Sequence, residues 1–195
     1  MPGSPWVPGS PWATRSPWAK DVLRFWFEET APEKWFQKDA ALDAAVRARF
    51  ARTHEHIANL TRDDCLTDPQ TALAAVIVLD QFSRNMFRGA PRAFASDPQA
   101  LRLAEAAIGR GFDVEVPEPA RLFFYLPLQH AEDAATQKRC VGLMAMLADP
   151  GLMKWAEAHK AIIDRFGRFP HRNAILGRKS TVDELDFLTR PGSSF

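Results

Sequence analysis

The chain has 195 residues, of which 46% are hydrophobic and 25% charged, a composition typical of a globular protein and not of a disordered one. Its 25 basic and 24 acidic side chains nearly balance, which excludes a global field that would attract nucleic acid or an anionic membrane. No stretch approaches the roughly 20 apolar residues of a membrane span and no secretory signal is recognisable, so we expect a cytoplasmic protein.

The N-terminus carries a repeated tripeptide. Ser-Pro-Trp occurs at residues 4–6, 10–12 and 16–18, and prolines at this density favour extended backbone. One interpretation is a short linear motif that uses the tryptophans as anchors. A low-complexity extension accounts for the pattern equally simply, and we favour it. We therefore predict a flexible tail over residues 1–16 and a single all-helical domain over residues 17–195.

Capping signals mark several helix ends after the tail. Asp68 and Asp97 each precede a proline, which predicts a capping side chain followed by proline at the first helical position. Thr181 with a glutamate three residues later matches a capping box, and Gly167 is well placed to end a helix in the left-handed conformation. These signals indicate helices joined by short loops.

The helical periodicity predicts an all-α fold with no strand. Six to eight helices joined by short loops should stack as antiparallel pairs. The fifth predicted helix contains Pro127, which should kink it. The predicted helices cover residues 17–28, 39–61, 69–87, 97–110, 118–148, 151–166 and 181–189.

Residues 73–79 are seven apolar residues in a row, which predicts a helix that is buried on all sides. At 100° per residue, Asp80 and Arg84 fall in the middle of the face that Leu73 and Val76 define. An ionised carboxylate buried there would be strongly unfavourable unless it were paired. Arg84 follows four residues later and can form that pair in the favourable order.

Two later helices show the same pattern. His130 lies at the centre of the apolar stripe of the fifth helix, and His159 lies at the centre of that of the sixth. A single buried histidine, or a single Asp–Arg pair, is usually only structural. Three helices that each turn a titratable side chain inward need polar partners, and the nearest partners are one another. We expect Asp80, Arg84, His130 and His159 to share one polar pocket.

Residues 165–173, after the sixth helix, alternate arginines and a histidine with two phenylalanines. Arginines suit bidentate binding of carboxylate or phosphate, which would place Arg168, His171 and Arg172 at the mouth of the pocket. The alternative is a loop whose arginines satisfy helix C-terminal carbonyls. Nucleic-acid binding is disfavoured because the basic run is short and the net charge is close to zero.

These residues belong to two motifs that resemble those of the domain of unknown function 924 family. The resemblance covers about residues 20–195, and it implies a tetratricopeptide-like, all-helical fold but no reaction and no cofactor. The family pattern often has serine where this chain has Ala131. The motifs are Leu79-Asp80-Gln81-Phe82 with Arg84-Asn85 and Phe87-Arg88-Gly89, and Phe166-Gly167-Arg168-Phe169-Pro170-His171-Arg172-Asn173 with Leu176-Gly177-Arg178.

Our first hypothesis is a small-molecule or anion site with acid–base chemistry, hydrolysis being the reaction class to test first. A histidine near its pKa at neutral pH can act as general base, and arginines can clamp a carboxylate or phosphate. Whether the protein is an enzyme stays open. The catalytic candidates are Asp80, His130 and His159, and the substrate-binding candidates are Gln81, Arg84, Asn85, Arg88, Arg168, His171 and Arg172.

Two other functions remain open. A tetratricopeptide-like groove could bind a peptide as a protein-interaction scaffold, an argument that rests on fold analogy alone. Asp80 with His130 and His159 could instead form an open metal site, although the neighbouring Arg84 argues against a cation. Cys65 lies far from the second cysteine in no metal or redox spacing. We predict no cofactor, a small anionic molecule or a peptide as partner, and leave a homodimer open.

Overall fold

The computed structural model describes residue 12 and residues 14–193. Over these residues the chain is helical and has no strand, which confirms the all-α prediction. Helix α1 (Pro17–Arg24) continues into a π-helical turn, η1 (Phe25–Glu29). The other elements are η2 (Pro32–Lys34), α2 (Ala40–Ala58), α3 (Arg62–Cys65), α4 (Pro69–Ile77), the π-helical turn η3 (Val78–Phe82), α5 (Ser83–Met86), α6 (Arg92–Ala95), α7 (Asp97–Gly109), α8 (Glu118–Gln129), α9 (Ala134–Met144), α10 (Pro150–Phe166), η4 (Pro170–Arg172) and α11 (Val182–Leu188).

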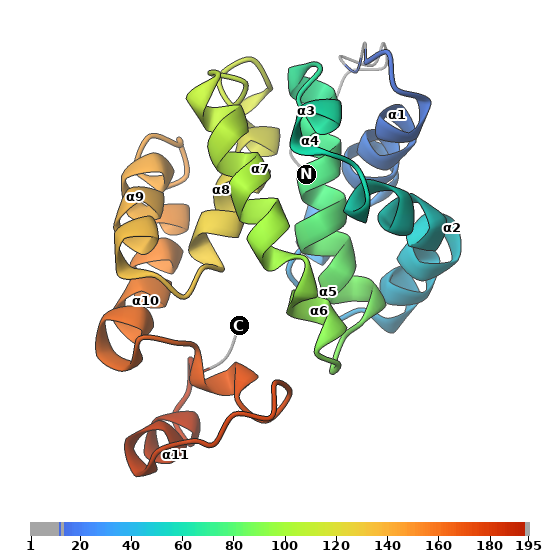
Figure 1. Cartoon of the computed structure of the whole chain (residues 1–195). Coiled ribbons are helices and arrows are strands. Elements are labelled where there is room, and N and C mark those ends of the chain that lie inside the picture. The colour runs from blue at the N-terminus through green and yellow to red at the C-terminus, as the bar shows by residue number, and fades with distance from the viewer. Residues whose placement is uncertain (1–11, 13, 194–195) are drawn as a thin grey trace.

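Neighbouring helices in the chain pack against each other in opposite directions, from α7 through α8 and α9 to α10 (Figure 1). Helix α4 lies between α1 and α7, and α2 packs on η3 and α5. This row of antiparallel helices is the arrangement expected of a helical superhelix, while a tetratricopeptide repeat as such stays a prediction. Helix α11 lies apart from the row, beyond the end of α10.

The predicted helix over residues 118–148 is wrong, because two helices occupy this range. Helix α8 ends at Gln129 and α9 begins at Ala134. Pro127 has no amide hydrogen to donate in the last turn of α8, and Asp133 starts the next helix by accepting a hydrogen bond from the backbone N–H of Thr136. The break between them places residues 130–133 in a loop instead of a kinked helix.

Three of the four helix-end signals are confirmed. The Asp68 carboxylate caps α4, the capping box at Thr181 starts α11, and Gly167 ends α10 with a φ of 70°. The fourth is wrong, because the N-cap of α7 is Ser96 and no side chain caps the helix there. The Asp97 carboxylate occupies the first helical position and binds arginines instead.

The core is rich in aromatic side chains and centres on α4. Residues 72–79 are completely buried, as their unbroken apolar sequence predicts. The ring of Trp26 lies 5.4 Å from that of Phe82 and 5.8 Å from that of Phe123, both in edge-on contact. Such edge-to-face pairs add about 0.5–1.5 kcal/mol each to the burial of the rings. They fix η1 and α8 on η3.

Most of the tail predicted over residues 1–16 lies outside the described residues. Trp12 is 2% exposed and stacks on Phe27 with 5.3 Å between ring centroids. The Thr14 hydroxyl shares a 2.8 Å hydrogen bond with that of Thr71 in α4. These two residues already contact the domain, and the predicted boundary at residue 17 otherwise stays a prediction.

Candidate functional site

Asp80 lies in the π-helical turn η3, inside a continuous helical segment from Pro69 to Met86. A π turn contains one residue more than an α turn and is frequent at functional sites. The Asp80 side chain is 1% exposed. A carboxylate so deeply buried stays ionised only where donors surround it.

Three side chains donate to Asp80. Gln81 Nε2 lies 2.6 Å from Oδ2, Arg84 Nη1 lies 3.1 Å from Oδ1, and His130 Nδ1 lies 2.8 Å from the same Oδ1. Burial alone would raise the pKa of Asp80, but the charge of Arg84 and the hydrogen bonds from His130 and Gln81 outweigh it and hold the pKa well below its ordinary value. An ionised carboxylate only accepts hydrogen bonds, so His130 donates through Nδ1.

Arg84 connects Asp80 to a second carboxylate. Its Nη1 and Nη2 donate to the two oxygens of Asp97 at 2.9 and 3.0 Å. Arg172 Nη1 reaches Asp97 Oδ2 at 3.4 Å from the segment that follows α10. Asp97 was expected to cap a helix, and the structure places it between two arginines. Asp97 and Asp68 both precede a proline, so the local pattern did not distinguish them.

His130 stands at the C-terminal end of α8, where the helix stops after Pro127. Its side chain is 15% exposed. Burial and the charge of Arg84 lower the pKa of His130 below its ordinary value, against the opposite effect of Asp80. The ring is therefore neutral at pH 7, and with Nδ1–H bound to Asp80 its Nε2 is a proton acceptor.

His159 and His171 lie beside this cluster without a hydrogen bond to Asp80 among the described contacts. His159 Nδ1 donates to the carbonyl oxygen of Trp155 at 2.8 Å, and its ring meets Phe169 edge-on at 5.7 Å. Burial lowers the pKa of His159 to about 3 and that of His171 to about 4, with a smaller contribution from the charge of Arg172. Both rings are therefore neutral at pH 7, and both lie close enough to Arg172 for its charge to lower their pKa values.

Three of the predicted substrate-binding side chains point elsewhere. Asn85 and Arg88 both donate to the carboxylate of Asp43 in α2, at 2.6–2.8 Å. Arg168 forms two bonds of 2.6 and 2.8 Å with Glu184 in α11. The structure thus brings Asp80, Gln81, Arg84 and His130 into contact, with Arg172 beside them, and ties the other three to acidic partners. Their predicted roles in binding are untested.

The comparisons with known proteins fit this architecture. Residues 22–192 match the family model described as "Bacterial protein of unknown function (DUF924)". The chain belongs to this family. No curated protein matches. A solved structure described as a protein of unknown function, ATU0120, from Agrobacterium tumefaciens is 44% identical, with a TM-score of 0.83 over 87% of this chain and 96% of that chain.

In this DUF924 chain, Glu132, which was not among the predicted site residues, binds the second motif. Glu132 accepts from Arg178 at 2.6 and 3.0 Å and from the backbone N–H of Phe169 at 2.8 Å. Arg178 also donates to the Asn173 side chain and to the Phe169 carbonyl oxygen. This network holds residues 168–178 over the end of α8 and so positions Arg172. Glu132 stands in the loop that the sequence analysis took for helix.

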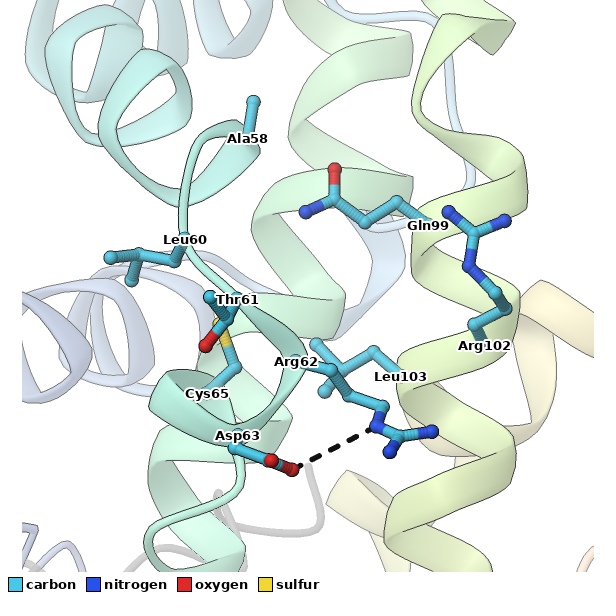
Figure 2. Close-up of a pocket in the computed structure, with 9 residues that line it drawn as sticks. All are labelled: Ala58, Leu60, Thr61, Arg62, Asp63, Cys65, Gln99, Arg102 and Leu103. Atoms are coloured by element: carbon cyan, nitrogen blue, oxygen red, sulfur yellow. Dashed lines mark ion pairs between the residues drawn. The ribbon is translucent and has the colours of Figure 1, made fainter.

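Two surface hollows of this DUF924 chain lie away from the Asp80 cluster. The larger, of about 510 Å³, lies between the α2–α3 turn and α7, and its lining includes Arg62 from one side and Arg102 from the other (Figure 2). The smaller lies beside α11 and is lined by Arg168 and Glu184 among others. Neither is lined by Asp80, Arg84 or His130.

The described residues contain no group of three or more His, Cys, Asp or Glu side chains placed to hold a metal ion. Burial raises the pKa of Cys65 to about 11 and that of Cys140 to about 12, so both thiols are protonated at neutral pH. Within the same residues, no helix of this DUF924 chain has the length and apolarity to cross a membrane.

Proposed function

We propose that this protein binds a small molecule with an anionic group at the Asp80–His130 cluster and moves a proton on that molecule through His130. The observation that carries the proposal is the 2.8 Å contact between His130 Nδ1 and Oδ1 of a carboxylate that is 1% exposed. A carboxylate bound to Nδ1–H orients the ring and leaves Nε2 to accept a proton. Ser-His-Asp sites use a carboxylate and a histidine in the same way.

The electrostatics support a general base more than a general acid. Burial and Arg84 lower the pKa of His130, so the unprotonated ring predominates at neutral pH. Asp80 stays ionised and stabilises the imidazolium that forms once the ring has taken a proton. The pair can therefore accept a proton and return it within one turnover.

Cationic groups beside the pair support an anionic ligand. Arg84 and Arg172 approach the same carboxylate, Asp97, and their side chains are 20% and 8% exposed. Arg84 is bound to Asp80 as well as to Asp97, whereas Arg172 makes a single bond of 3.4 Å to Asp97, so the Arg172 guanidinium keeps donors that suit a carboxylate or phosphate.

The burial favours a small molecule over the peptide scaffold. A peptide groove would present polar side chains along an exposed concave face, whereas Asp80, Arg172 and His130 are at most 15% exposed. The metal hypothesis lacks support, since His159 lies outside hydrogen-bonding reach of the Asp80 carboxylate among the described contacts and Arg84 already neutralises that carboxylate.

The first test reads the proton position on His130 directly. Nitrogen-15 NMR of the imidazole distinguishes the two neutral tautomers, and we expect the Nδ1–H form for His130 near neutral pH. His56, an exposed histidine at the end of α2, provides the internal reference for an unconstrained ring. A dominant Nε2–H form for His130 would remove the basis of the proposal.

The second test follows release of p-nitrophenol from p-nitrophenyl acetate and from p-nitrophenyl phosphate. We expect turnover that rises with pH through the pKa of His130 and falls about 100-fold or more in His130→Gln. His56→Gln is the matched control and should keep the wild-type rate. Turnover that survives in His130→Gln, or no turnover of either ester, would contradict hydrolysis through this histidine.

A further inference from the structure

Arg172 keeps a hydrogen-bonding edge that the described part of the protein does not use. The residue is 6% exposed, and its Nη1 reaches Asp97 at 3.4 Å. Its Nε is buried and has no hydrogen-bond partner in the described part of the chain. Buried N–H groups are almost always paired, so an unpaired one beside a candidate site indicates a ligand.

Two phenyl rings restrict the approach to this edge. Arg172 Cζ lies 4.8 Å from the ring centroid of Phe94 and 4.6 Å from that of Phe169. Aromatic rings this close to a guanidinium restrict its movement and exclude water from it. The side of the group that has donors left is the one formed by Nε and Nη2, since only Nη1 bonds to Asp97.

The charge of Arg172 is also poorly compensated. Its partner Asp97 makes two shorter bonds, of 2.9 and 3.0 Å, to Arg84. Glu132 is near enough to act on Arg172, but its oxygens are bound by Arg178 and by the Phe169 N–H. Burial, and then the charge of Arg84, lower the pKa of Arg172 to about 10. An added negative charge would stabilise this guanidinium.

We propose that the Nε–Nη2 edge of Arg172 binds a carboxylate group of the ligand, with two parallel hydrogen bonds in the guanidinium plane. This inference rests on the proposed function, because it names the anionic group of the molecule on which His130 acts. A planar carboxylate matches the planar fork. Phosphate can accept the same two bonds, but its further oxygens would lie close to the apolar rings of Phe94 and Phe169, which offer them no donor.

The test observes the Nε–H signals of arginine by NMR while sodium acetate is added at constant ionic strength. We expect a saturable downfield shift of the Arg172 Nε–H proton and slower exchange of that proton with solvent. Inorganic phosphate should shift it less at equal concentration. The exposed Arg102 of α7 serves as internal control and should shift without saturation.

Arg172→Lys keeps the charge and removes the fork, so acetate affinity should fall about tenfold or more, whereas Arg102→Lys should keep it. Circular dichroism checks that both variants fold. No saturable shift in the wild type, or unchanged affinity in Arg172→Lys, would overturn the inference, and tighter binding of phosphate would overturn the choice of carboxylate.

Failure of this inference and failure of the proposed function can be told apart. Acetate binding that persists in His130→Gln, in a protein that turns over neither ester, would leave the carboxylate fork in place and remove the proton transfer. Turnover that depends on His130, without any acetate shift at Arg172, would support the proton transfer and remove the carboxylate fork.

Discussion

Replacement of Asp97 by asparagine is expected to destabilise the fold markedly, because this carboxylate stands between two arginines. It accepts from Arg84 at 2.9 and 3.0 Å and from Arg172 at 3.4 Å. Asparagine keeps one acceptor oxygen and no charge, so the two-bond pairing with Arg84 is lost. The two guanidinium groups would then face each other without the carboxylate that both of them bind.

The magnitude follows from the number of bonds and their exposure. One charge-assisted hydrogen bond is lost, worth about 1.5–3 kcal/mol, and the remaining bonds weaken. A fully buried pair that loses one partner costs about 3–5 kcal/mol, but the Asp97 and Arg84 side chains are 18% and 20% exposed. We therefore expect a loss of about 2–4 kcal/mol in the free energy of unfolding, or about 5–15 °C in Tm for a chain of this size.

Asp68→Asn is the matched control, since Asp68 also precedes a proline. Its Oδ1 accepts from the backbone N–H groups of Gln70 and Thr71, at 3.0 and 2.8 Å. Asparagine caps a helix about as well as aspartate, so this change should cost less than about 1 kcal/mol. Urea denaturation followed by circular dichroism measures both variants. Equal losses would refute the argument that the two aspartates have different roles.

Three further predictions concern stability. Gly167→Ala should lower the free energy of unfolding by about 1 kcal/mol in urea denaturation, because the residue has a φ of +70°. Gly142→Ala, inside α9 with open space at its Cβ, should raise it by about 0.5–1 kcal/mol. Equal effects of the two changes would contradict this. The pKa of His159 is about 3 in the folded protein and near 6.5 in the unfolded chain, so the unfolded chain binds a proton that the folded protein does not. The free energy of unfolding should therefore fall as the pH drops from about 6.5 to about 4, and His159→Gln should make that slope shallower by about 1.4 kcal/mol per pH unit; an unchanged slope would show that the ring is not buried in the neutral form. Glu132→Gln weakens the bonds to Arg178, so limited trypsin digestion should cut within residues 168–178 sooner than in the wild type, and an unchanged cleavage pattern would mean that other contacts hold the segment.

Local patterns were sufficient to predict the all-α class and the buried central helix. The apolar run at residues 73–79 indicates a buried helix, and burial of a charged side chain requires a partner within reach. Arg84 is in reach of Asp80 because the two are four residues apart on one helix. His130 was placed near them from the apolar stripe of a predicted helix over residues 118–148, but in the structure it follows the last residue of α8 and reaches Asp80 from the loop. Each of these steps needs only the helical period and the cost of burying charge.

Contacts between distant segments could not be predicted in the same way. Asp97 and Asp68 have the same local sequence pattern, and only the packing of η3 against α7, together with the approach of η4, gives Asp97 its arginines. Arg168 was expected at the pocket mouth, and its partner Glu184 lies 16 residues away in a helix whose position the sequence does not give. A long polar side chain binds whichever acceptor the tertiary fold brings near.

The π-helical turn at residues 78–82 explains why the helical period was sufficient to predict that Asp80 points inward. It also contributes to the site. All residues of the turn are buried, so any phase of the helix would have turned a carboxylate at this position inward. The turn does more than bury Asp80, because Arg84 Nη1 bonds both to its side chain and to its carbonyl oxygen. A carboxylate held from three sides in the core cannot rotate, whereas His130 and Arg172 come from a loop and from a segment after α10. Any movement on ligand binding is therefore expected to shift residues 130–133 and 167–180 together, because Glu132 joins the two segments, with Asp80 as the fixed reference.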